Sequence, residues 1–334
     1  MQNINKFKEP EMIWSDVQKK WICYDNTLND IILKSSDFQV LDYNLEDFKK
    51  RFSVALPLTE GVLKILPLAH EGQQHKELRK EMQIEIERNS QKGIEIFKRE
   101  FKTQINNADY SLQTFDLAKI LIDSILRSNL ALANINLNND FDYSDFTLIL
   151  DDTQSVNQRK RREQKIRGFL DEIGAEAKLP KIALMLVGVN GLISSTLNSI
   201  INILQNKNFE YLKNRKFFYS TGIKSLQRIC ISNAKVGNIL IKKGEIVKLM
   251  SMPYDDLNLS ELQINKKFFV SGTSHACQGM AFSLHVWKEM VKVLDDKFSD
   301  LHLTSFRFRK NDGIFDFPTE LNVKFKLKND STTE

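Results

Sequence analysis

The sequence predicts a single, mostly α-helical domain with small β-sheets. Glycine (13) and proline (6) are scarce in 334 residues, which favours long uninterrupted helices. Several long stretches carry apolar residues at helical spacing, whereas the strand patterns are short and lie mostly in the second half of the chain. No repeat or linker divides the sequence. We therefore expect one domain over residues 1–326 and a disordered polar tail over 327–334.

The expected elements follow one another along the chain. Residues 20–34 predict a short strand, a turn at Asp25 and Asn26, and a short helix. Helices are expected at 72–101, 112–132, 158–173 and 180–205; the last is apolar on nearly every face, which is typical of a buried central helix. Two hairpins are expected, one at 238–250 turning at Lys243 and Gly244, the other at 305–317 turning at 311–313.

Composition excludes several classes of protein. The formal net charge of +5 is too small for a nucleic-acid-binding signature. The three cysteines, Cys23, Cys230 and Cys277, show no zinc-site spacing and no disulfide framework, which favours a reducing, cytoplasmic location. The N-terminus is polar, and the longest apolar run, at 182–188, is far shorter than a membrane span. We expect a cytoplasmic protein without membrane or nucleic-acid partners.

One cysteine lies in a distinctive setting, FFVSGTSHACQGMAFSLHVWKEM at 268–290. A loop of small residues precedes Cys277, and helical spacing begins soon after Gly279. Free N–H groups at a helix start favour a thiolate, and glycine lets a flat ligand approach the backbone. These are the needs of a metal-binding thiolate. The pattern also fits a buried structural cysteine, so the residues alone leave both interpretations open.

The loop SGTSHACQG resembles the haem-ligand loop of the cytochrome P-450 family. His275, Cys277 and Gly279 match the family pattern, in which a long helix follows. Two positions depart from it, because Val270 stands where the family usually has Phe and Thr273 where it has Gly. The resemblance implies that Cys277 is the axial ligand of the iron of haem b.

Other segments resemble the same family in the same order along the chain. His75 and Arg79 form an H-x-x-x-R pair on one helix face, which in the family binds a haem propionate. The apolar helix resembles the family's central helix, with Val187 and Gly188 at its usual Ala-Gly pair. Arg228 matches a further propionate-binding arginine. The resemblance implies that His75, Arg79, Arg228 and His275 hold the propionates, and that Val187, Gly188 and Asn190 line the distal pocket.

The central helix departs from the family where an acid and a threonine normally relay protons to bound dioxygen. Asn190 and Gly191 occupy those positions, while Ser194, Ser195 and Thr196 lie a turn further on. GVNGLI resembles members that rearrange or dehydrate hydroperoxides, in which the Asn positions the peroxide. An equally open interpretation is that Asn190 merely caps a kink in the helix.

The family's buried E-x-x-R ion pair is also missing. Arg215 and Phe218 stand where its Glu and Arg are expected, and the segment between Gln205 and Arg228 is short. Glu210 and Lys213 have the right spacing and are a candidate substitute.

The resemblance implies an enzyme, a haem-thiolate monooxygenase acting on a small or medium apolar substrate with electrons from a separate protein. One alternative is a haem-thiolate isomerase, dehydratase or peroxygenase, which needs no acid–alcohol relay. A second is a non-catalytic haem-binding or partner-binding module. Four lysines, Lys76, Lys80, Lys266 and Lys267, are expected to form a basic face that suits an acidic, ferredoxin-like electron donor.

Overall fold

The structure is a computed structural model that describes residues 12–41, 56–67, 70–135, 145, 155–172, 174, 179–251, 260–309 and 315–328. The side chains of residues 62–63, 179–180 and 182–187 are not described either, so of Val187 only the backbone position on a helix is known. The hairpin turn expected at 311–313 lies outside the described residues, as does the end of the predicted tail from 329 onward.

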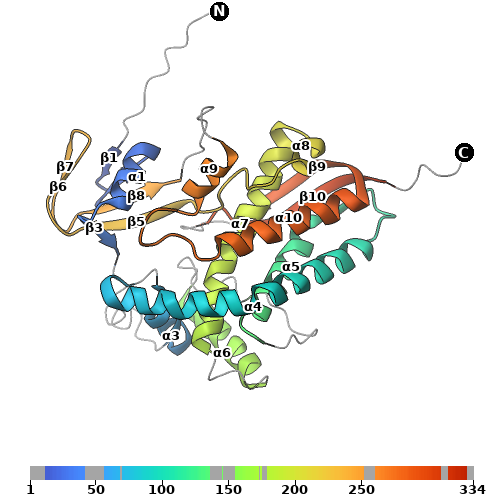
Figure 1. Cartoon of the computed structure of the whole chain (residues 1–334), viewed down its shortest axis with the longest axis horizontal. Helices are drawn as coiled ribbons and strands as arrows, with labels where there is room; N and C mark the ends of the chain where they lie inside the picture. The colour runs from blue at the N-terminus through green and yellow to red at the C-terminus, as the bar shows by residue number, and fades with distance from the viewer. Residues whose placement is uncertain are drawn as a thin grey trace, which may run out of the picture.

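Helices dominate the described chain, as predicted (Figure 1). They are α1 (Asn26–Lys34), α3 (Pro57–Ile65), α4 (Gly72–Asn106), α5 (Leu117–Leu132), α6 (Val156–Glu172), α7 (Leu179–Asn206), α8 (Phe209–Lys213), α9 (Glu261–Phe268) and α10 (Met280–Lys297). Short polar side chains start several of them. Asp25 accepts a hydrogen bond from the Leu28 N–H at the start of α1, and Asp116 accepts one from the Ala118 N–H at the start of α5. Within the described residues, no helix is both long enough and apolar enough to cross a membrane.

The strands form small sheets at the two ends of the molecule (Figure 1). The five-stranded sheet has the order β1-β2-β8-β5-β3, from Met12–Ser15, Lys20–Cys23, Ile246–Met250, Ser225–Cys230 and Phe38–Val40. The three-stranded sheet has the order β4-β10-β9, from Thr114–Asp116, Pro318–Leu327 and Phe298–Phe308. A further pair joins β6 (Ala234–Val236) and β7 (Ile239–Ile241). The predicted class, mostly α with small β-sheets, is confirmed.

One predicted hairpin is wrong in its pairing. The strands expected to pair across Lys243 and Gly244 exist as β7 and β8, but β7 pairs with β6, and β8 joins β5 and β2. Gly237, in the left-handed region at φ 58°, makes the tight β6–β7 turn instead. The turn at Gly244 is real, and its N–H donates to the carbonyl of Cys230, so it carries the chain from one sheet to the next.

Two hydrophobic cores hold the fold together. The larger lies among α4, α5, α7, α10 and the β9–β10 sheet, and includes the fully buried Phe97, Phe101 and Trp287. The smaller lies between α1 and the five-stranded sheet and contains Cys23 and Cys230. These two cysteines are therefore packing residues, and all three cysteines are free thiols. Helix α4 packs against both α5 and α10, which brings its N-terminal half toward the segment that precedes α10.

Candidate functional site

Cys277 lies in a loop between α9 and α10 whose backbone is held at several points. Helix α9 starts with a capping box between Ser260 and Gln263, which fixes the entry to the loop. The N–H of Cys277 donates to the carbonyl of Phe269 at 2.9 Å, which folds the loop back on the end of α9. Val270 and Gly272 both have positive φ, at 53° and 87°, which makes the reversal tight. The backbone of Cys277 is therefore fixed in place.

The Cys277 thiol is exposed to solvent and is also partly desolvated by the surrounding protein. Its side chain is exposed, yet it lies deep enough among protein atoms that burial raises its pKa above the ordinary value. The Gly279 N–H and the charge of Arg79 act in the opposite direction but do not prevail. Burial thus opposes the effect expected of the helix start, and in the free protein it shifts the Cys277 pKa toward the thiol. Coordination to a metal cation deprotonates a thiol regardless of such a shift.

The imidazole of His275 contacts the predicted H-x-x-x-R helix directly. Its ring centroid lies 4.3 Å from that of His75, which is buried near the start of α4. Nε2 of His275 lies 3.1 Å from Oε1 of Glu71, the residue that immediately precedes α4. The same carboxylate oxygen accepts a hydrogen bond of 2.9 Å from the N–H of Val40 in β3. Glu71 thus joins the sheet, α4 and the cysteine loop.

Two guanidinium groups complete this cluster. Arg228 of β5 is buried, donates to the carbonyl of Gln227, and lies close enough to Glu71 and His275 to interact with both electrostatically. Arg79 of α4 interacts electrostatically with Cys277. Burial lowers the pKa of both arginines, which nevertheless remain charged. The structure therefore brings together Cys277 and all four residues expected at the propionates: His75, Arg79, Arg228 and His275.

Burial also shapes the two histidines. It lowers the pKa of His75 to about 4, assisted by the nearby charges of His275 and Arg79. Burial lowers the pKa of His275 as well, and the Glu71 carboxylate opposes that shift. In the described part of the chain, Nε2 of His75 and Nδ1 of His275 are buried without a hydrogen-bond partner. Such nitrogens are normally paired, so the cluster has unused capacity to bind an oxygen acceptor.

These observations fit a haem in three respects. The unpaired imidazole nitrogens and two cationic side chains suit propionate carboxylates. The thiol is the soft donor that an axial position requires. Glycine at position 279 is not required by protein packing, because a Cβ there would meet only Cys277 Sγ at 3.8 Å and Ser283 Oγ at 3.9 Å. A flat macrocycle would require glycine there, because only glycine lets it approach the backbone closely.

The expected distal residues lie on α7, outside the interactions that join the cluster. Gly188 is exposed, and a Cβ added to it would meet nothing within 4 Å. Asn190 is buried, and Gly191 faces Phe315, whose ring would lie 3.8 Å from a Cβ added to that glycine. Oγ of Ser195 accepts a hydrogen bond of 3.0 Å from the N–H of Gly222, while Ser194 and Thr196 are completely buried. The hydroxyls a turn further on are thus packed within the protein.

The candidate substitute for E-x-x-R is a surface pair. Glu210 and Lys213 form an ion pair at 2.5 Å on α8, but the Glu210 side chain is 66% exposed. A pair so exposed cannot reproduce a buried one. The buried guanidinium in this region belongs to Arg215, whose partner is Glu261 at 2.7 Å. Spacing could not reveal this pair, because its two residues lie on different segments.

The sequence motifs did not single out two further residues near the site, Glu71 and Gln278. Glu71 lies one turn before His75, and only its position beside the H-x-x-x-R pair could have signalled it. Gln278, next to Cys277, donates to the carbonyl of Arg79 at 2.6 Å and to Oε1 of Gln83 at 3.2 Å. These bonds tie the cysteine loop to α4 directly.

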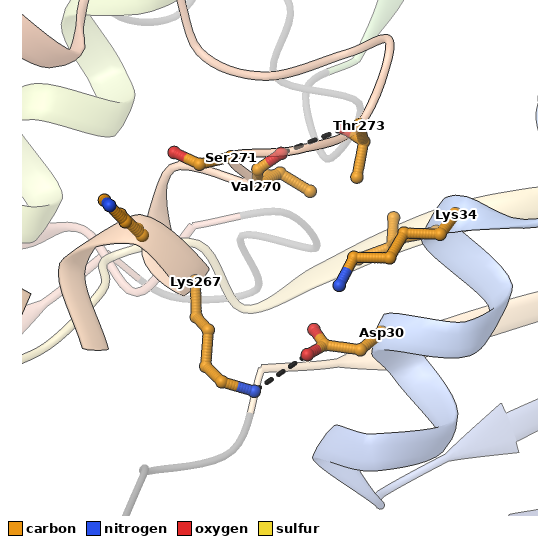
Figure 2. A pocket seen from close by; sticks show the side chains of 8 residues that line it. Asp30, Lys34, Lys267, Val270, Ser271 and Thr273 are labelled. Atoms are coloured by element: carbon orange, nitrogen blue, oxygen red, sulfur yellow. Dashed lines mark hydrogen bonds and ion pairs between the residues drawn. The ribbon is translucent and has the colours of Figure 1, made fainter. Parts of the chain in front are cut away.

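Of the predicted basic face, Lys76, Lys80 and Lys266 are exposed, whereas Lys267 forms an ion pair with Asp30 at 2.7 Å. Figure 2 shows this pair at a small pocket of about 60 Å³ between α1 and the start of the cysteine loop. None of the clustered residues around Cys277 lines it. The pocket is therefore distinct from the candidate site.

Comparison with solved structures defines the class of fold. The epothilone B-bound cytochrome P450epoK aligns with a TM-score of 0.74 at 15% identity, covering 95% of this chain and 94% of the other. P450 RauA, complexed with a biosynthetic intermediate of aurachin RE, gives 0.70 at 13% identity over 95% and 94%. P450BioI, complexed with an acyl carrier protein ligated to hexadec-9Z-enoic acid, gives 0.67 at 15% identity over 92% of each chain.

The chain therefore has the cytochrome P450 fold, as the sequence resemblance predicted. No family model matches the sequence, and no curated protein sequence matches it. At such identities the likeness concerns the fold, and the chemistry has to be argued from this chain's own residues.

Proposed function

We propose that the protein is a haem-thiolate oxidoreductase with Cys277 as the axial ligand of haem b. The observation that carries the proposal is the convergence of Cys277 with His75, Arg79, Arg228 and His275, which come from three separate parts of the chain. The cluster beside the exposed thiol holds two guanidinium groups and two buried imidazole nitrogens that have no hydrogen-bond partner among the described residues. Two carboxylates and an iron would satisfy it.

Each residue then has a definite task. Cys277 would hold the iron through its sulfur as a thiolate, with its proton lost to solvent, and Arg79 would stabilise the negative charge. Arg228 and the two imidazoles would hold the propionates by charge and hydrogen bonds. Gln278 holds the loop against α4, so that the thiol keeps its direction. A thiolate-ligated haem supplies activation of dioxygen or peroxide.

The reaction we favour is monooxygenation of a small or medium apolar substrate. Gly188 would leave room over the macrocycle, and the buried Asn190 would offer an amide to a polar atom there. Electrons would come from an acidic, ferredoxin-like donor attracted by Lys76, Lys80 and Lys266, which are exposed. Three free cysteines agree with the cytoplasm as the proposed location.

Asn190 and Gly191 favour a second candidate, a peroxide-dependent enzyme, because neither side chain relays protons as an acid and an alcohol do. Turnover separates the candidates. The haem-loaded protein is supplied with a panel of apolar substrates and either a reductase, ferredoxin and dioxygen, or hydrogen peroxide alone. Product only in the first mixture supports the monooxygenase. Product with peroxide alone supports the second candidate, and haem binding without product in either mixture would point to a non-catalytic module.

A further inference from the structure

Arg215 is a buried cation in the segment between α8 and β5, with most of its donors in use. Its side chain is only 4% exposed. Nε donates to the carbonyl of Phe217 at 3.0 Å, and Nη2 donates to that of Phe218 at 3.3 Å. Nη1 donates to the Tyr211 hydroxyl at 2.7 Å, and the guanidinium lies 4.8 Å from the centre of the Tyr219 ring. The side chain thus fixes the turn formed by residues 215–218, which we call the arginine turn.

The arginine turn is joined to α9, the helix that leads into the cysteine loop. Nη1 of Arg215 also donates to Oε1 of Glu261, in the first turn of α9, at 2.7 Å. One turn further along, the buried Asn265 side chain pairs with the backbone of Phe218, accepting from its N–H at 3.2 Å and donating to its carbonyl at 3.0 Å. An ion pair and a two-bond amide pair therefore hold α9 at two successive positions.

The same turn is joined to α10, the helix that leaves the cysteine loop. Nε1 of the fully buried Trp287 donates to the carbonyl of Arg215 at 3.1 Å. The Trp287 ring packs against that of Phe218 at 5.1 Å. Phe218 in turn contacts the ring of Phe269, 5.9 Å away, whose carbonyl accepts the N–H of Cys277. The arginine turn thus binds both helices that flank Cys277, by hydrogen bonds, an ion pair and ring packing.

We infer that Arg215, acting with Glu261 and Asn265, is a positioning device that sets the direction of Cys277. The inference rests on the proposed function, since a thiol needs a fixed direction only if something binds to it. The loop spans the distance between the ends of α9 and α10, so any change in their separation moves the sulfur. The Arg215–Glu261 pair bridges two segments, so it holds the arginine turn against the helix that enters the cysteine loop.

Three variants test this device against a control. Glu261→Gln removes the charge of the partner and keeps its shape, and Arg215→Lys keeps the charge but loses the planar fork. Arg215→Met removes both. The control is Glu163→Gln, which weakens a buried carboxylate that accepts bonds from Leu58 and Thr59 at the start of α3, away from the cysteine loop. It lowers stability without touching Cys277.

Haem affinity and the carbon monoxide spectrum of the reduced protein provide the first measurement. We expect Arg215→Met to weaken haem binding by about tenfold, the lower end of the loss seen when a group that bonds a metal ligand directly is removed, because Arg215 acts on Cys277 only through the flanking helices. The thiolate-type band should give way to that of a displaced or protonated ligand. Glu261→Gln and Arg215→Lys should show the same change to a smaller extent, and Glu163→Gln should show neither.

The second measurement needs no haem. Alkylation of the accessible Cys277 is followed in the free protein, with the buried Cys23 and Cys230 as internal references for global opening. Loosening of the loop should change the Cys277 rate alone in the Arg215 and Glu261 variants. If wild type binds no haem while this change appears, the proposed function fails and the positioning device stands. If spectra, affinity and alkylation all follow stability as in Glu163→Gln, the inference is wrong.

Discussion

The rings of His75 and His275 lie 4.3 Å apart, inclined at 35° to each other, although they come from distant parts of the chain. One belongs to the first turn of α4 and the other to the loop before α10. Each is buried with one ring nitrogen unpaired in the described part of the chain. This contact places the H-x-x-x-R face beside the cysteine loop, so the cation cluster and the thiol form one site.

His75 should make stability depend on pH. Its pKa is about 4 in the folded protein and about 6.5 when unfolded, so only the unfolded chain binds a proton between these values. The free energy of unfolding should therefore fall as pH drops from about 6.5 to 4, by about 1–3 kcal/mol from this group. His75→Gln should reduce that slope in urea titrations of the haem-free protein, and His275, whose pKa is also lowered, should account for part of what remains. His285→Gln, at an exposed position on α10, should leave it unchanged; equal slopes in wild type and His75→Gln would contradict the assignment.

Glu71→Gln should strengthen haem binding. The Glu71 carboxylate already interacts with His275 and Arg228, so it competes with a propionate for the same cations. Removing its charge relieves repulsion of about 1–2 kcal/mol, equivalent to about 5- to 30-fold in affinity. The amide oxygen can still accept the Val40 N–H. Haem titration at low and high salt measures this effect. Weaker binding in the variant would show that Glu71 serves only to orient His275.

Arg228→Gln should have the opposite effect. The guanidinium is buried, and among the described residues it donates through Nη1 to the Gln227 carbonyl, so other N–H groups remain for a carboxylate. We expect haem affinity to fall by about tenfold or more, because a charge-assisted hydrogen bond is lost. Lys235→Gln, an exposed cation on the neighbouring β6, is the matched control. An equal loss of haem affinity in both variants would show that the effect comes from net charge alone and contradict a direct role for Arg228.

Two glycines should respond oppositely to alanine. A Cβ at Gly222 would lie 2.1 Å from Cβ and 2.3 Å from the backbone carbon of Ser194, so Gly222→Ala must push its loop away from α7. We expect a loss of about 2 kcal/mol or more. Gly188→Ala meets no atom within 4 Å and lies in a helix, so a gain of up to about 1 kcal/mol is expected. Thermal unfolding of both variants measures this. A stable Gly222→Ala would contradict the close packing.

Local patterns were enough to predict much of the fold and to single out three of the five residues that converge at the candidate site, Cys277, His75 and Arg79. Spacing identified α4, α7 and the helix after Cys277, and it placed His75 and Arg79 on one face. Chain order and family resemblance brought in Arg228 and His275. These signals work because each depends on residues close in sequence, where helical geometry is fixed.

What could not be predicted depends on contacts between distant segments. The Arg215–Glu261 pair joins two segments with no shared periodicity, whereas the correctly spaced Glu210–Lys213 pair proved to be on the surface. The raised pKa of Cys277 results from burial by the surrounding fold, which no local motif encodes. The pairing of β7 with β6 was likewise decided by the turn at Gly237 and by the sheet that captures β8.

The most direct test of the central claim is the absorption spectrum of the haem-loaded protein, reduced and exposed to carbon monoxide. Wild type should show the strongly red-shifted Soret band of a thiolate-ligated haem. Cys277→Ser should abolish that shift, while Cys230→Ala, which changes a buried packing cysteine, should retain it. A red-shifted band that survives in Cys277→Ser, or a wild-type protein that takes up no haem, would contradict coordination of iron by this sulfur.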